Sequence, residues 1–183
     1  MLVRSFDGLE YPNKPWLPCP KDQPWLHMCA ALSDRFPASL IWPEHTEVYK
    51  GTGEGGLVIR AQAANIRCSY HGDGFTMSKK GDPCPIYCDE PGAKLWKCAW
   101  RSNQLSKMMD ANDGSHNEVV LDSVAWVEAL PSTIEAVFAV AGEAQARARQ
   151  IHQDYLRTYG LTEEVVPLLI YDPRGWPPFS RLV

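Results

Sequence analysis

The sequence predicts an α/β protein in which a small, mainly parallel sheet in the C-terminal part follows a disulfide-stapled, loop-rich N-terminal half. Three mainly apolar runs, at 119–121, 134–140 and 165–171, alternate with helical segments, and only Glu135 interrupts the second run with a charge. The order strand, helix, strand, helix, strand is typical of a parallel sheet, and unbroken apolar runs are typical of strands covered on both faces. All six cysteines lie within the first 98 residues, which indicates covalent cross-links in the half with the weakest periodicity.

The length of 183 residues favours a single domain. Within it, residues 1–101 form the stapled half, which is rich in cysteine, tryptophan and proline, and residues 102–183 form a helix followed by the alternating strands and helices. Hydrophobic residues make up 45% of the chain and charged residues 22%. This composition supports a buried core and excludes intrinsic disorder.

The local patterns of the N-terminal half are weak. Four prolines without periodicity predict an extended arm over residues 1–21, and Asp22 is suited to cap a short helix. A strand is expected at 39–42. The glycine-rich sequence GTGEGG at 51–56 predicts a turn that leads into a further strand at 57–59.

Residues 62–101 are predicted to form a loop region that is cross-linked by disulfides. It contains four cysteines, and Asp, Gly and Pro recur at intervals that exclude a long helix. Ser102 is then suited to cap a short helix that includes Leu105 and Met109.

The connections of the C-terminal part determine its predicted topology. A short helix is expected at 124–130, where Pro131 ends it. The crossover from 123 to 133 is close to the minimum of about 10–12 residues that a parallel connection needs. Because Pro167 cannot donate to a ladder, the third strand is expected to start there or to lie at a sheet edge.

The strongest helical pattern runs from Gly142 to Tyr159. Its apolar residues recur at the spacing of one helix face, and Gly160 is placed to end the helix. His152 lies beside Ile151 and is expected to be a surface or packing residue rather than one member of a Cys–His nucleophilic pair. The apolar face consists of Ala144, Ala148, Ile151, Tyr155 and Tyr159.

The cysteines allow three interpretations, of which a disulfide framework is preferred. A bridge between Cys19 and Cys29 would contribute about 2–3 kcal/mol, and the other four cysteines would pair in any of three ways. The alternatives are a zinc site built from those four cysteines or a set of buried reduced thiols. The six residues are Cys19, Cys29, Cys68, Cys84, Cys88 and Cys98.

Charge and hydropathy narrow the classes of partner and the location. Eighteen basic and 22 acidic residues give a net charge of −4, which weighs against nucleic acid and anionic membranes as partners. No apolar run approaches a membrane span, and the N-terminus lacks a signal-peptide core. Disulfides nevertheless predict a secreted or luminal protein whose signal peptide has been removed.

Neither a cofactor nor a metal is expected, and the glycines at 51–56 lack the ending of a phosphate-binding loop.

Carboxylates at strand ends are the candidate catalytic residues. Open parallel sheets bind ligands beyond the carboxyl ends of their strands, where this sequence places Asp122, Glu143 and Asp172. Two carboxylates that met there would bind a divalent cation or serve as acid and base. The structural alternative is that Asp122 starts a helix and that Asp172 belongs to an ordinary Asp-Pro turn.

The candidate ligand-binding residues are His71, Asp73, Trp96 and Trp100. His71 and Asp73 lie in a polar, turn-rich segment, where they would bind a metal or a sugar. Exposed tryptophan rings would stack on a sugar or clamp a partner. The structural alternative for His71 and Asp73 is a solvated loop. For Trp96 and Trp100 the structural alternative is core packing, which is favoured.

The chain also resembles a domain of known occurrence but unknown activity. The order of segments within 57–179 carries this resemblance: GLVIR, RCSYHGDGFTM, KCAWRSNQLSKMM, NEVVLDSVAWVEALPSTIEAVF, ARQIHQDYLRTYGL and VPLLIYDP. It is similar to an uncharacterised cysteine-bearing domain of secretory-pathway proteins from unicellular algae. The resemblance covers about two thirds of the chain. It implies an extracytoplasmic setting and no particular catalysis.

The sequence therefore predicts a secreted or luminal recognition domain that binds a glycan or a protein. One alternative is a hydrolase or transferase that acts on a polar or glycosylated substrate through the three strand-end carboxylates. Another is a structural subunit of a larger assembly. The sequence does not predict the oligomeric state.

Overall fold

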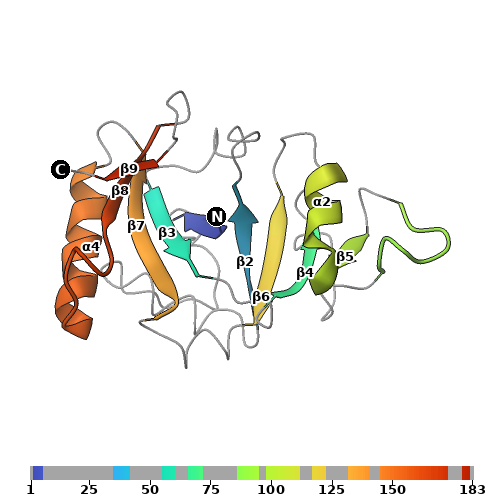
Figure 1. Ribbon diagram of the computed structural model, residues 1–183, viewed down its shortest axis with the longest axis horizontal. Coiled ribbons are helices and arrows are strands. Elements are labelled where there is room, and N and C mark those ends of the chain that lie inside the picture. The colour runs from blue at the N-terminus through green and yellow to red at the C-terminus, as the bar shows by residue number, and fades with distance from the viewer. Residues whose placement is uncertain are drawn as a thin grey trace, which may run out of the picture.

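The structure is a computed structural model, and it places nine strands in one sheet (Figure 1). The order of the strands across the sheet is β5-β4-β6-β2-β1-β3-β7-β8-β9. The described residues are 2–5, 35–41, 55–60, 66–71, 86–94, 98–111, 117–122, 132–140, 145–172 and 179–181.

Five of these strands come from the first 101 residues and four from the remainder. The strands are β1 (Leu2–Ser5), β2 (Arg35–Leu40), β3 (Gly55–Ile59), β4 (Ile66–Tyr70), β5 (Ala99–Arg101), β6 (Glu118–Asp122), β7 (Ile134–Val140), β8 (Leu168–Tyr171) and β9 (Phe179–Arg181). The helices in the described residues are the 3-10 helix η3 (Ser102–Gln104), α2 (Leu105–Ala111) and α4 (Gln145–Tyr159). Both predicted halves thus contribute to one sheet, in which β6 of the C-terminal half lies between β4 and β2 of the N-terminal half.

The prediction of a mainly parallel α/β sheet is wrong. Among the strand pairs that the structure describes, β7 and β8 pair in parallel and every other pair is antiparallel. Strand β6 does not neighbour β7, because β2, β1 and β3 lie between them. The apolar run of β6 is unbroken for a different reason. Its antiparallel neighbours β2 and β4 place it inside the sheet, and both of its faces are buried.

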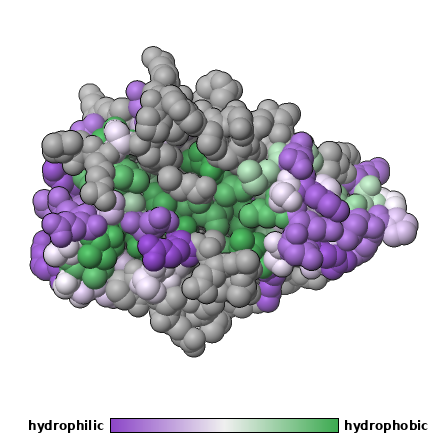
Figure 2. Space-filling view, in the orientation of Figure 1, coloured by the Kyte–Doolittle hydropathy of each residue, from purple (hydrophilic) through white to green (hydrophobic). Residues whose placement is uncertain are grey.

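The main hydrophobic cluster occupies one face of the sheet, beneath both helices. Leu57 and Ile59 of β3 belong to it, together with Met108 of α2 and Ile151 of α4. Figure 1 shows α4 at one end of the sheet and α2 near the other. In the same orientation, Figure 2 shows a hydrophobic surface between the two helices, flanked by more hydrophilic ends.

The opposite face carries two smaller clusters. Val58, which alternates with Leu57 and Ile59, packs there with Phe138 and Tyr171. The ring centroids of Phe138 and Tyr171 are 6.3 Å apart in an edge-on arrangement, which is a favourable geometry for two aromatic rings. The other cluster consists of Cys68, Tyr70, Ala99 and Val120, with Tyr87 packed against it.

Two expectations for the N-terminal half need correction. Leu2–Ser5 is not part of an extended arm but forms β1, which lies between β2 and β3. Gly55 and Gly56 are not in a turn but begin β3. A Cβ atom on Gly55 would collide with the backbone of Phe138 and Ala139 on β7, so glycine is needed there for the strands to approach each other. The helix expected after Asp22 lies outside the described residues.

The predictions for α4 and β7 are confirmed. The strand at 134–140 has the expected bounds, and α4 ends at Tyr159 before Gly160, which has a φ of 63°. The Leu161 N–H donates to the carbonyl oxygen of Leu156 at 2.9 Å, as expected for a helix terminated by a left-handed glycine. Strand β8 starts directly after Pro167, and β9 covers its outer edge. The helix expected at 124–130 lies outside the described residues.

Alkaline pH is expected to destabilise the fold through Tyr171. Burial, followed by the nearby Asp172 carboxylate, raises the pKa of Tyr171 to about 12, and its side chain is fully buried. The folded-state pKa lies above the ordinary value of about 10. Tyr171 therefore contributes fully to the free energy of unfolding below pH ~10. This contribution, up to about 2–3 kcal/mol, is lost as pH rises towards 12. Urea unfolding across this range checks it, with Tyr171→Phe as the control that removes the ionising group. A Tyr171 phenol that titrates near pH ~10 in the folded protein would contradict it.

Candidate functional site

Asp122 and Asp172, two of the three predicted catalytic carboxylates, lie far apart in the sheet. Asp122 ends β6 and Asp172 follows β8, and these strands are five positions apart in the sheet. At about 4.8 Å between neighbouring strands, that separation is roughly 24 Å. Glu143 lies outside the described residues. The geometry therefore gives no support to an acid–base pair formed by Asp122 and Asp172.

Of the predicted ligand-binding residues, the structure describes His71 and Trp100, which lie at the neighbouring strands β4 and β5. His71 directly follows β4 and is half-buried, whereas Asp73 and Trp96 lie outside the described residues. Trp100 lies on β5 opposite Ser69 and packs against the main hydrophobic cluster. Its indole Nε1 is buried, and none of the described residues accepts a hydrogen bond from it. The structural alternative of core packing therefore describes Trp100 better than a ring exposed to a sugar.

A disulfide between Cys88 and Cys98 staples the segment 86–94 onto the edge of the sheet. We call this segment the stapled loop. The Ala99 N–H donates to the Ile86 carbonyl at 2.8 Å, and the Cys88 N–H donates to the Ala99 carbonyl at 2.9 Å. Since β5 is the last strand on this side, the stapled loop covers backbone groups that an unprotected edge would expose.

The disulfide interpretation of the cysteines is supported for three of them. Cys68 is disulfide-bonded as well as Cys88 and Cys98, and its partner lies outside the described residues. Because three of the four sulfurs proposed for zinc are in disulfides, they are not available as thiolate ligands, and the zinc interpretation is wrong. Cys19, Cys29 and Cys84 lie outside the described residues.

The tip of the stapled loop is a tight turn determined by Pro91 and Gly92. The Ala93 N–H donates to the Glu90 carbonyl at 3.2 Å, and Gly92 has a φ of 81°. Proline in the second position and a left-handed glycine in the third are the residues that a type II turn requires. The Glu90 N–H also donates to the Tyr87 carbonyl at 3.0 Å. Two successive backbone hydrogen bonds thus fix the shape of the loop.

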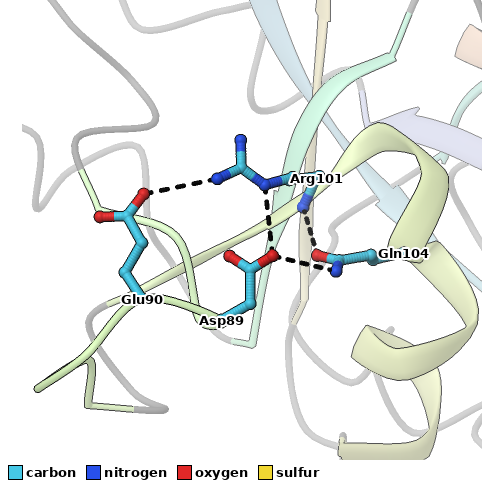
Figure 3. A network of polar contacts seen from close by, with 4 residues as sticks. All are labelled: Asp89, Glu90, Arg101 and Gln104. Carbon is cyan, nitrogen blue, oxygen red and sulfur yellow. Dashed lines mark hydrogen bonds and ion pairs between the residues drawn. The ribbon is translucent and has the colours of Figure 1, made fainter.

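Arg101 of β5 and Gln104 of η3 contact the two acidic side chains of the loop, as Figure 3 shows. The Arg101 Nε donates to Asp89 Oδ2 at 3.3 Å, and its terminal nitrogen donates to Glu90 Oε1 at 3.5 Å. The Gln104 amide donates to the same Asp89 oxygen at 3.3 Å. The guanidinium also lies 3.7 Å from the ring centroid of Tyr87, at the distance of a cation–π contact. We call Tyr87, Asp89, Glu90, Arg101 and Gln104 the Arg101 clamp.

The clamp lowers the pKa of Asp89 and contributes little to the stability of the fold. Desolvation acts to raise the pKa of Asp89, but the hydrogen bonds from Arg101 and Gln104 and the Arg101 charge together hold that pKa below its ordinary value. Asp89, Glu90 and Arg101 are more than two-fifths exposed, and exposed ion pairs contribute little to stability. These contacts therefore define where the loop lies against β5 and add little to the free energy of unfolding.

The stapled loop projects from the end of the molecule away from α4 (Figure 1). It exposes Ile86, whose exposed fraction is 47%, together with the turn residues Pro91 and Gly92. Among the described residues, Ile86 and Val165 are the large hydrophobic side chains that are exposed. An apolar side chain thus lies outside the core on a loop that a disulfide and backbone hydrogen bonds attach to the sheet edge.

Sequence reasoning missed the Arg101 clamp. Within the predicted loop region, the sequence does contain Cys88 and Cys98, which are typical of a disulfide, and Pro91-Gly92, which is typical of a turn. Nothing in the local sequence indicates that Arg101 contacts Asp89, because these residues meet only when β5 lies beside the loop.

Two further findings concern classes of site. In the ranges that the structure describes, no group of three or more His, Cys, Asp or Glu residues is arranged to hold a metal ion. In the same ranges, no helix combines the length and the hydropathy that crossing a membrane requires.

The chain matches no known protein-family model, no curated protein and no solved structure.

Proposed function

We propose that this protein is a secreted or luminal recognition domain that binds a protein ligand through the stapled loop. The observation that carries the proposal is the fixation of an exposed loop by a disulfide, a type II turn and the Arg101 clamp. Disulfides persist in oxidising compartments, which supports a location outside the cytosol. Loops held on a rigid scaffold are common positions for binding residues.

The rigidity of the loop favours binding for a physical reason. Association costs free energy for each loop or side chain that becomes ordered, and a loop that is already ordered avoids part of that cost. The exposed groups are an apolar side chain, Ile86, and a Pro-Gly turn. Such a surface suits a protein ligand better than a sugar, since Trp100 packs into the core and the ring of Tyr87 is covered by Arg101.

Matched surface variants test the proposal. The full chain is assayed against an array of extracellular protein domains and, in parallel, against a glycan array. For a protein ligand found in this way, Ile86→Asp is expected to weaken binding about tenfold or more, as at a central interface residue. Arg101→Met, which releases the clamp, is expected to weaken it less. Val165→Asp is the control, because it changes the other exposed hydrophobic residue without touching the stapled loop.

The outcomes separate the recognition surface from the rest of the molecule. Arg101→Lys should resemble Arg101→Met, because lysine retains the charge but cannot form the forked contacts of a guanidinium. Binding that is lost only in Val165→Asp would contradict the proposal. Binding to glycans alone, unchanged in Ile86→Asp, would contradict it as well.

A further inference from the structure

Two buried polar atoms lie on the neighbouring strands β4 and β5 without a hydrogen-bond partner among the described residues. They are the hydroxyl Oγ of Ser69, a residue that is 1% exposed, and the indole Nε1 of Trp100. Ser69 and Trp100 are directly opposite each other in the antiparallel pairing of the two strands. Because buried polar atoms in folded proteins nearly always have a partner, two unpaired ones on opposite residues need a physical explanation.

The two side chains lie on the same face of the sheet. Successive residues of a strand point to opposite faces, and Tyr70 and Ala99, which follow Ser69 and precede Trp100, belong to the small cluster on the other face. Trp100 packs against the main hydrophobic cluster. Val119, which is the partner of Ser69 on β6, is a member of that main cluster. The hydroxyl and the indole are therefore both on the helix-covered face.

The described surroundings of these two atoms are apolar. Helix α2 contacts both β4 and β5 (Figure 1). Its Met108 is a fully buried member of the main cluster, and its Leu105 packs against that cluster. These side chains offer neither an acceptor for the indole N–H nor a strong hydrogen bond to the hydroxyl. A small polar molecule held between the two strands would satisfy both groups.

A water molecule suits this position in size and in hydrogen-bonding capacity. The Cβ atoms of directly opposite residues in an antiparallel pair are about 4.5–5.5 Å apart, and two hydrogen bonds of about 3 Å through one water span up to roughly 6 Å. The indole N–H can only donate, whereas the serine hydroxyl can donate or accept. A water oxygen accepts from the first and bonds to the second, and buried waters typically have about two to four such partners.

We propose that a buried water molecule bridges the Ser69 hydroxyl and the Trp100 indole N–H beneath α2. The bridge joins β4 to β5 through side chains, in addition to the backbone pairing of the two strands. It involves no residue of the stapled loop, so failure of the proposed recognition function would leave this inference intact.

Oxygen-17 magnetic relaxation dispersion of the full chain tests the bridge, because it counts water molecules that stay bound longer than the protein takes to tumble. Ser69→Ala is expected to contain one long-lived water fewer than the natural chain. Trp100→Phe should lose the same water, since an apolar cavity left by the indole N–H stays dry. Ser180→Ala is the matched control, because it removes an exposed serine hydroxyl from another strand and should keep the count.

Urea unfolding of the same variants provides a second measurement with a sign that separates the alternatives. If the water is present, Ser69→Ala breaks the bridge and should raise the equilibrium constant of unfolding about five- to tenfold. Ser180→Ala should change this constant by less than about twofold. Removing a buried hydroxyl that has no partner at all would instead leave the constant unchanged or lower it. The proposal is overturned by that result, or by an unchanged water count in Ser69→Ala.

Discussion

Replacing Phe138 by alanine is expected to lower the free energy of unfolding by about 3–5 kcal/mol. Phe138 is fully buried on β7 and packs against Val58 and Tyr171. Truncation removes the transfer free energy of the ring and leaves a cavity, because neighbouring strands on both sides of β7 limit collapse. Urea unfolding of the variant and the natural chain measures the difference.

Two variants of the same strand calibrate this result. Phe138→Leu keeps most of the volume and should cost less than half as much. Glu135→Ala removes an exposed side chain and should change stability by no more than about 0.5 kcal/mol. A loss below about 1 kcal/mol for Phe138→Ala would contradict the finding that this face of the sheet is closed by a packed cluster.

The parts of the fold that the sequence predicts correctly depend on local patterns. The helix α4 has a 3.6-residue apolar period and a terminating glycine, and the runs of β6, β7 and β8 are apolar enough to be recognised as strands. The unit formed by β7, α4 and β8 was therefore predictable, including its parallel pairing. Both signals act within a few residues, so they do not depend on the rest of the chain.

The strand order could not be predicted in this way, because it depends on contacts between distant segments. The run of β6 looks the same whether its neighbours are parallel or antiparallel, since burial on both faces produces it in either case. Strand β1 has four residues and β5 has three, too few to show a period of two. The stapled loop was predicted as a loop with cysteines, but its attachment through Arg101 depends on the pairing of Tyr87 with Ala99.

Replacing Asn117 by alanine is expected to lower the free energy of unfolding by about 2–4 kcal/mol, because it leaves two buried backbone groups without partners. The side-chain Oδ1 of Asn117 accepts from the Leu40 N–H at 2.8 Å, and its Nδ2 donates to the Leu40 carbonyl at 2.8 Å. Asn117 is fully buried. The amide thus extends the ladder between β2 and β6 beyond its last backbone pair, Ala38 with Val119. Thermal or urea unfolding checks the loss, with the exposed Asn103→Ala as the control.

Asn117→Asp separates the hydrogen bonds from the shape of the side chain. An ionised carboxylate can accept from the Leu40 N–H but would place its other oxygen against the Leu40 carbonyl, so the folded state should raise the pKa of the introduced carboxyl. Stability should then be retained below the ordinary value of about 3.9 and lost as pH rises through the higher folded-state pKa. Equal stability of this variant and the natural chain at neutral pH would show that the two contacts to Leu40 do not fasten β6 to β2. Strands β4 and β5 follow β6 at this end of the sheet, and the stapled loop is bonded to β5. The contact between Asn117 and Leu40 therefore helps to attach the proposed recognition surface to the remainder of the sheet.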